Sequence, residues 1–203
     1  MIAVIDYGIN NSSSVVRMIE KVGGEVKRVC DPEDLKDASK LILPGVGHFD
    51  EGMKRLDSIG FREPLRKMIK ERNIPILGIC LGMQLLCRSS EEGDSSGLGF
   101  VAARVRPLDG EVRENLKIPH MGWNTLDVVK SNSLILENFG TQRFYFVHSY
   151  YVELDSNDLC IAQANYGAKF CAAFQSNQIF GVQFHPEKSH RFGMSLMKNF
   201  VNL

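Results

Sequence analysis

Residues 78–82 have the composition of a nucleophile turn. They read Gly-Ile-Cys-Leu-Gly and place Cys80 between two glycines, where an apolar run ends and a helical pattern begins. A sharp strand-to-helix turn lifts its central side chain above a sheet, and a Cβ on either flank would clash there. A helix start favours the thiolate, and the N–H of Leu81 faces the place where an oxyanion forms. The alternative interpretation is a buried structural cysteine.

A second segment supplies the base that a thiol nucleophile needs. Residues 179–187 predict a strand that ends on His185, where Pro186 stops the strand and stiffens the turn. Glu187 follows two residues later, and its carboxylate can accept a hydrogen bond from the imidazole and orient the ring, as in a Cys-His-acid triad. Taken singly, His185 would be a surface residue at a strand end and Glu187 ordinary surface charge.

A glycine-containing loop is predicted on the same side of the sheet as Cys80. Pro44, Gly45, Val46 and Gly47 follow an apolar strand over 41–43, which we expect Pro44 to halt. Glycines let the backbone approach a substrate closely and offer N–H groups to it. The loop is weak support by itself, because many parallel strands end in such turns.

Composition excludes several classes of function. The chain has 203 residues with 24 basic and 24 acidic side chains, and no block of like charge that would indicate a nucleic-acid or membrane surface. No apolar run reaches the roughly 20 residues of a membrane span, and an early acidic residue argues against a signal peptide, so we expect a cytoplasmic protein. The five scattered cysteines and the histidine spacing predict neither disulfides nor a metal site, and we expect no cofactor.

The hydrophobic pattern predicts one α/β domain over residues 1–203, with a mixed, mostly parallel central sheet flanked by helices. Short apolar strands alternate with helices in the first half, as in a parallel sheet covered on both faces, and strands dominate the second half. The strands are expected at 2–5, 26–29, 41–43, 74–79, 101–108, 125–129, 143–147, 159–164, 170–174 and 179–184. Helices are expected after caps at Ser12–Ser14, on the face made by Phe61, Leu65, Met68 and Ile69, from Met83, and around Phe192–Phe200.

Four segments together resemble the class I glutamine amidotransferases. They are LPGVG (43–47), GICLGMQLL (78–86), FVHSYY (146–151) and GVQFHPEKS (181–189). The resemblance covers nearly the whole chain and is highly specific. Within the family, PHMGWN (119–124) followed by FVHSYY is similar to the branch of glutaminase subunits that serve imidazole glycerol phosphate synthases in histidine biosynthesis.

The resemblance implies a role for each matching residue. Cys80 would attack the side-chain amide of glutamine, His185 would take and return the proton, and Glu187 would orient His185. A γ-glutamyl thioester would form, and water would release glutamate. Oxyanion donors would come from Leu81 and from the loop at Gly45, Val46 and Gly47. Glutamine would be held by Gln84, Glu92, Ser149 and Tyr150, although Gln84 could instead be a solvent-facing helix residue and Glu92 an exposed loop acid.

The resemblance also implies a partner, since the 203 residues leave no room for a second domain that accepts ammonia. The family pairs the glutaminase with a (β/α)8 synthase subunit as a heterodimer, and ammonia passes through that barrel. The matching interface residues are Asn10, His120, Met121, Trp123, Tyr145 and Lys188; Trp123 could equally be a core or surface anchor. Asn10 departs from the family, which usually has glycine there, so a second branch that feeds an amino-sugar synthase for surface polysaccharides is the alternative.

Other classes fit the sequence less well. A non-enzymatic regulatory subunit would be expected to lack a triad member, whereas all three are present. A cysteine peptidase or γ-glutamyl hydrolase would not need the PHMGWN segment, and a redox enzyme of the related thiol fold would lack the His-Pro-Glu strand end. Glutamine hydrolysis without an acceptor wastes substrate. We therefore expect the lone chain to be nearly inactive, with its loop at 45–47 misaligned until the liganded synthase binds.

Overall fold

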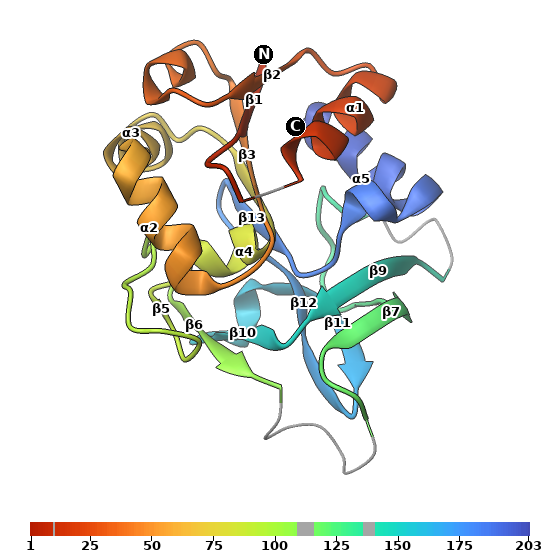
Figure 1. The fold of residues 1–203 in the computed structure, drawn as a ribbon. Coiled ribbons are helices and arrows are strands. Elements are labelled where there is room, and N and C mark those ends of the chain that lie inside the picture. Colours follow the sequence, from red (N-terminus) through yellow and green to blue (C-terminus); the bar gives the residue numbers. More distant parts are fainter. Residues whose placement is uncertain (10, 109–115, 136–140) are drawn as a thin grey trace.

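The central sheet runs through the whole molecule in the computed structural model, which describes residues 1–9, 11–108, 116–135 and 141–203. Its main path has the order β2-β1-β3-β4-β13-β12-β10-β6-β5, with β11 and β8 attached beside β12 (Figure 1). Strands β2, β1, β3, β4 and β13 are parallel, and β12 starts the antiparallel part. This arrangement agrees with the predicted mixed, mostly parallel α/β sheet.

The strands of this sheet have the following bounds: β1 Ile2–Ile5, β2 Val26–Val29, β3 Lys40–Gly45, β4 Ile76–Cys80, β5 Ser89–Ser90, β6 Ala103–Pro107, β8 Asp127–Val128, β10 Tyr150–Leu154, β11 Cys160–Tyr166, β12 Ala168–Ser176 and β13 Ile179–Val182. A separate two-stranded antiparallel ribbon pairs β7, His120–Thr125, with β9, Arg143–His148. The ribbon joins the site through a bridge between Tyr145 and His185.

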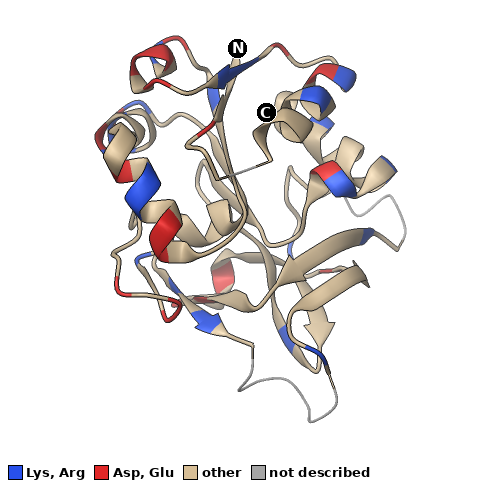
Figure 2. Ribbon diagram, viewed as in Figure 1, with Lys and Arg blue, Asp and Glu red and all other residues tan. Residues whose placement is uncertain are grey.

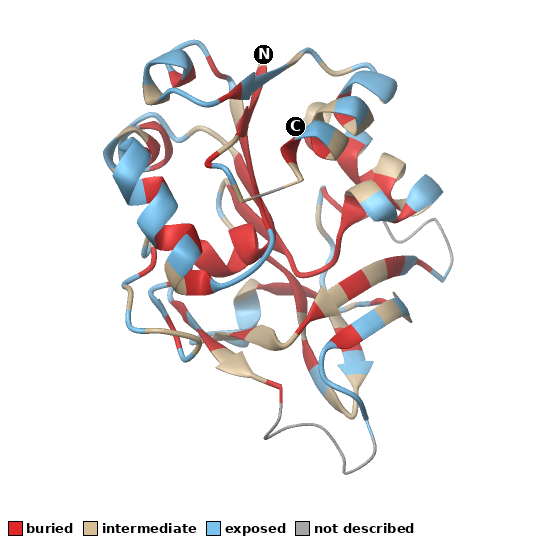
Figure 3. Cartoon of the chain, viewed as in Figure 1, coloured by how far each residue is buried: buried red, intermediate tan, exposed pale blue. Residues whose placement is uncertain are grey.

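Helices cover both faces of the parallel strands, as Figure 1 shows. They are α1 Ser12–Lys21, α2 Phe49–Ile59, α3 Arg62–Arg66, α4 Leu81–Leu85 and α5 His190–Val201, with a π-helical turn η2 at Lys67–Glu71 and 3-10 turns η1 Pro32–Leu35, η4 Asn157–Leu159 and η5 Pro186–Lys188. One buried cluster lies between the sheet and α2, α3 and α4, and a second lies beneath α1 and α5. Because alternate β1 residues enter the two clusters, both faces of that strand are buried (Figure 3).

Helix α2 was not predicted, although its signals are present in the sequence. Its buried residues Phe49, Met53 and Leu56 recur at helical spacing, and Asp50 and Glu51 lie in its first turn. The ring of His48 caps its start by accepting from the N–H of Asp50, and Gly60 ends it at φ +90°. Its outer face carries both signs of charge side by side (Figure 2).

Three other expectations are corrected. Pro44 does not halt its strand, because β3 continues to Gly45; the pairing with β1 ends at Ile42, so the missing N–H of Pro44 costs no bond on that side. Ser12–Ser14 are not the cap of α1: Asn11 precedes the helix, and no side chain caps it. The strand expected at 125–129 is two elements, since Thr125 ends β7 and β8 covers Asp127–Val128. The rest of β7 and the strands β5 and β10 were not predicted.

Within the described ranges, no helix is both long enough and apolar enough to cross a membrane.

Candidate active site

Cys80 is the last residue of β4 and directly precedes α4, as the nucleophile turn requires. Its backbone has φ +54° and ψ −111°, a conformation that L-residues rarely adopt and that costs on the order of 1–3 kcal/mol. A Cβ on Gly82 would lie 1.7 Å from the carbonyl oxygen of Leu43, and one on Gly78 would lie 2.7 Å from the backbone of Met83. The two glycines therefore leave room for the turn, as predicted.

His185 and Glu187 form the expected acid–base pair, although β13 ends at Val182 and not on His185 as predicted; only an isolated bridge to Tyr145 continues the pairing there. The Nδ1–H of His185 donates to Oε1 of Glu187 over 2.7 Å, and both side chains are about 1% exposed. Two further hydrogen bonds position the pair: Ser189 donates to the backbone carbonyl of His185, and Asn11 donates to the same carboxylate oxygen of Glu187. This contact fixes the imidazole with Nε2 as the free nitrogen.

The electrostatics of His185 suit a thiolate–imidazolium pair. Burial lowers the pKa of His185, but the neighbouring Cys80 and Glu187 outweigh it and raise the pKa to about 10. Among the described residues, Nε2 of His185 has no hydrogen-bond partner. This nitrogen is therefore the group on His185 that can accept the Cys80 proton and later release it to a leaving amine.

Two buried glutamines form a hydrogen-bonded chain that ends on Cys80. Nε2 of Gln183 donates to Sγ of Cys80 over 3.7 Å, and Nε2 of Gln84 donates to Oε1 of Gln183 and to the carbonyl of Tyr150. The thiol of Cys80 also reaches the carbonyl of Val147, at 3.8 Å. The sequence analysis assigned no role to Gln183, which is fully buried in the loop after β13. Gln84 is buried rather than solvent-facing.

A cavity of about 350 Å³ opens beside Cys80 and collects most of the predicted site residues. Its lining is Val46, Gly47, Cys80, Leu81, Gln84, Glu92, Pro119, Val147, His148, Ser149, Tyr150 and His185. Glu92 faces this cavity while one of its oxygens accepts from the N–H of Phe49 at the start of α2. Gly45 does not line the cavity, because it is buried in β3 opposite Cys80.

The loop after β3 lines the cavity, but its Val46 N–H is bonded elsewhere in this structure. The N–H of Val46 donates to the carbonyl of Ile9 over 3.4 Å, so this expected oxyanion donor points toward the segment that follows β1. Gly47 follows at φ +97°, a conformation that glycine adopts without steric cost and that strains other residues. The loop therefore has the freedom to rotate a peptide.

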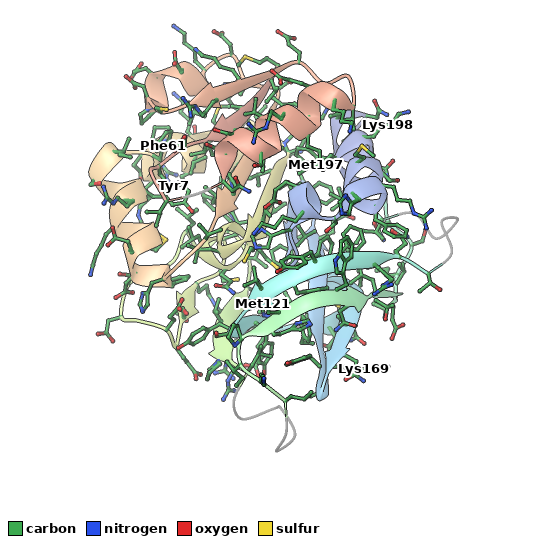
Figure 4. All side chains as sticks on the ribbon, turned by 45° about the vertical axis from the view of Figure 1, so that its right-hand side comes forward. Tyr7, Phe61, Met121, Lys169, Met197 and Lys198 are labelled. Atoms are coloured by element: carbon green, nitrogen blue, oxygen red, sulfur yellow. The ribbon has the colours of Figure 1, made fainter. Side chains whose placement is uncertain are left out.

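Four of the predicted interface residues form one surface group. Met121 and Trp123 on β7 are 61% and 40% exposed, and Met121 is labelled in Figure 4. Trp123 contacts Tyr145 edge-on, and the ammonium of Lys188 lies 5.6 Å from the Tyr145 ring. The structure thus places these four side chains together beside η5. The predicted interface residue Asn10 lies outside the described residues.

His120 is separated from that group because β7 turns it inward. It is 3% exposed and stacks between Phe146 and Tyr166. His148 donates from Nδ1 to the carbonyl of Tyr150, so its Nε2 must accept from Nδ1–H of His120, 2.9 Å away. Burial lowers the pKa of His120 to about 4 and that of His148 to about 3, which keeps both rings neutral.

The arrangement can perform acyl transfer from an amide. It offers a thiol at a strained turn, a base aligned by a carboxylate, and a cavity with polar groups at its rim. Among the residues that the structure describes, no three His, Cys, Asp or Glu side chains are grouped to hold a metal ion.

Comparisons with known proteins agree with this chemistry. The profile of the family described as "Glutamine amidotransferase class-I" matches residues 3–203. The chain is 47% identical to imidazole glycerol phosphate synthase subunit HisH 2 of Methanococcus maripaludis over 99% of this chain and 98% of that one. It is 45% identical to the subunit of the same name from Pseudomonas aeruginosa over the full length of both. The structure of PurLQS from Thermotoga maritima superposes with a TM-score of 0.73 at 19% identity, covering 98% of this chain and 94% of that one, which shows the shared fold. The chain belongs to the class I glutamine amidotransferase family.

Proposed function

We propose that this chain is the glutaminase subunit of an imidazole glycerol phosphate synthase and that Cys80, His185 and Glu187 hydrolyse glutamine. The observation that carries the proposal is the 2.7 Å contact between His185 and Glu187 beside Cys80, in a cavity that Gln84, Glu92, Ser149 and Tyr150 also line. A thiol, a base and an orienting acid are the parts that amide cleavage through a thioester needs.

The proposed reaction proceeds in two acyl transfers. The Cys80 thiolate attacks the side-chain carbonyl of glutamine, and the protonated His185 gives its proton to the departing nitrogen, so that ammonia leaves and a γ-glutamyl thioester remains. His185, now neutral, takes a proton from water as the water attacks the thioester. The carbon–sulfur bond then breaks and glutamate leaves, which restores the Cys80 thiolate beside the protonated His185. Both tetrahedral intermediates need N–H donors, which Leu81 and Val46 would supply.

The choice of acceptor rests on the relatives named above and on the exposed aromatic group. Relatives at 45–47% identity along the whole chain bear the name of a histidine-pathway synthase subunit. Met121, Trp123, Tyr145 and Lys188 form a surface suited to a protein partner, since exposed aromatic and methionine side chains are enriched at interfaces. The proposed partner is a (β/α)8 synthase subunit that receives the ammonia, and the proposed compartment is the cytoplasm.

The proposal includes control of the glutaminase by that partner. The Val46 N–H is bound to Ile9, so an active state requires the Gly45–Val46 peptide to rotate and present this N–H to the cavity. A partner whose binding favours the rotated peptide would increase glutamine hydrolysis without adding a catalytic group. The lone chain would then hydrolyse glutamine slowly, which avoids waste of ammonia.

The test is glutamate release from glutamine by the chain alone, by the chain with a cyclase subunit and its nucleotide ligand, and by Cys80→Ala with both. We expect strong stimulation by the liganded cyclase and none in Cys80→Ala. Equal turnover with and without the cyclase would contradict the proposed control. Stimulation only by an amino-sugar synthase would contradict the histidine-pathway acceptor and direct attention to Asn10.

A further inference from the structure

Tyr7 carries a buried hydroxyl that the proposed mechanism does not use. The side chain is fully buried in the cluster beneath α2, α3 and α4 and is labelled in Figure 4. Its Oη has no hydrogen-bond partner among the described residues. A buried hydroxyl without a partner is disfavoured, so a hydroxyl kept in such a place invites a functional explanation.

The hydroxyl of Tyr7 lies against the loop that must rotate. A Cβ built on Gly45 would be 2.5 Å from Oη of Tyr7 and 2.9 Å from the backbone nitrogen of Gly82. Tyr7 therefore touches Gly45 at the junction between β3 and the nucleophile turn. Burial above all, with smaller effects of Cys80 and Asp6, raises the pKa of Tyr7, so the hydroxyl keeps the proton that it could donate.

Rotation of the Gly45–Val46 peptide exchanges the positions of its two polar groups. In a planar trans peptide the N–H and C=O point in opposite directions. The Val46 N–H now points to Ile9, so the Gly45 carbonyl points the other way. When the N–H turns toward the cavity, the carbonyl turns away from it and needs a new donor in the buried region beside β1.

Three donors of the segment after β1 are already engaged among the described residues. The N–H of Gly8 and the hydroxyl of Ser12 both donate to the carboxylate of Asp6, at 3.0 and 2.7 Å. The amide of Asn11 donates to Glu187. The Tyr7 hydroxyl already contacts Gly45, and the carbonyl oxygen of Gly45 lies only about 2.4 Å from its own Cα, given standard bond lengths. The rotated carbonyl therefore stays close to this hydroxyl.

We propose that Tyr7 is a positioning residue for the oxyanion loop: its hydroxyl donates to the Gly45 carbonyl when the Gly45–Val46 peptide turns the Val46 N–H toward the cavity. The inference rests on the proposed control of the glutaminase by a synthase partner. In the state described here the Tyr7 hydroxyl has no hydrogen-bond partner among the described residues, and in the rotated state it gains the Gly45 carbonyl as its acceptor. The difference favours the rotated peptide and so lowers the cost of activation.

The test is Tyr7→Phe, which removes the hydroxyl and preserves the ring. Stimulated glutaminase kinetics and thermal unfolding are measured for the wild type, for Tyr7→Phe and for Tyr151→Phe, a hydroxyl deletion on β10. We expect the stimulated kcat of Tyr7→Phe to fall about tenfold, with the KM for glutamine within about twofold and the Tm not lowered. Tyr151→Phe is expected to keep the wild-type stimulation and KM, whatever the loss of its own hydroxyl does to the Tm.

Each other result has a distinct meaning. A stimulated wild type with an equally stimulated Tyr7→Phe overturns the positioning role. A fall in Tm, or a change in KM that accounts for the loss, assigns Tyr7 to packing or to substrate binding and also overturns it. A wild type that the liganded synthase does not stimulate refutes the proposed control itself, before any variant is compared.

Discussion

At the residue scale, the site depends on side chains that the motif did not indicate. The glycines, Cys80, His185 and Glu187 could be predicted because each has a local reason in the sequence, such as a turn or a strand end. Gln183 could not, because it follows a strand that is buried on both faces, and the continuous apolar run around it does not indicate which way a side chain points. Tyr7 was missed for a different reason: the role proposed for it depends on a contact with Gly45, which lies far from it in the sequence.

Gln183 gives a prediction about thiolate reactivity. Its amide donates to Sγ of Cys80, and a hydrogen bond to a charged acceptor stabilises that charge. In Gln183→Met we expect alkylation of Cys80 by iodoacetamide at neutral pH to slow about tenfold, while Gln84 keeps its bond to the carbonyl of Tyr150. Peptide mass spectrometry locates the adduct.

Gln183→Glu serves as the companion variant. It keeps an acceptor for Gln84 but places a like charge against the thiolate, so the rate should fall further. Alkylation at the wild-type rate in Gln183→Met would show that the amide does not support the thiolate.

At the element scale, the nucleophile turn was predicted well and its surroundings less well. The strand before Cys80 and the helix after it follow from an apolar run and two glycines. The extension of β3 through Pro44 could not be predicted, because it depends on which neighbour pairs with that residue. Strand β7 was missed because its large apolar residues, Met121 and Trp123, lie on its exposed side and because it contains a glycine.

Gly82 provides a test of how tightly β3 packs against the turn. In Gly82→Ala the new Cβ would lie 1.7 Å from a backbone oxygen, which cannot move without shifting β3. We expect the free energy of unfolding to fall by about 3 kcal/mol, measured by urea denaturation.

The matched control is Gly52→Ala in α2, where the nearest atoms are 3.1 Å away at the end of the flexible Leu85 side chain. Alanine also suits a helix interior, so this variant should be as stable as the wild type or more so. Equal stabilities of the two variants would contradict the described packing.

At the scale of the whole molecule, the buried histidines give the stability a defined pH dependence. The pKa of His148 is lowered to about 3, so the unfolded chain binds a proton there that the folded chain does not between about pH 6.5 and 3. Stability therefore falls on acidification through this range. The pKa of His185 is raised to about 10, so its contribution is complete below about pH 6.5 and is lost as pH rises toward 10.

The acid branch is the easier one to measure. From pH 7 to pH 5, His148 should cost the folded state about 2 kcal/mol. In His148→Gln the decline in unfolding free energy, measured by urea denaturation at several pH values, should be shallower by that amount. Parallel pH profiles for wild type and variant would show that folding does not lower the pKa of His148.

The central claim is that Cys80 forms a γ-glutamyl thioester, and the most direct measurement is acid quenching of the protein during turnover of labelled glutamine, followed by mass spectrometry. With the liganded synthase present, we predict a γ-glutamyl group on the peptide that contains Cys80 and none in Cys80→Ala. A label on another residue, or undiminished glutamate release by Cys80→Ala, would contradict the account.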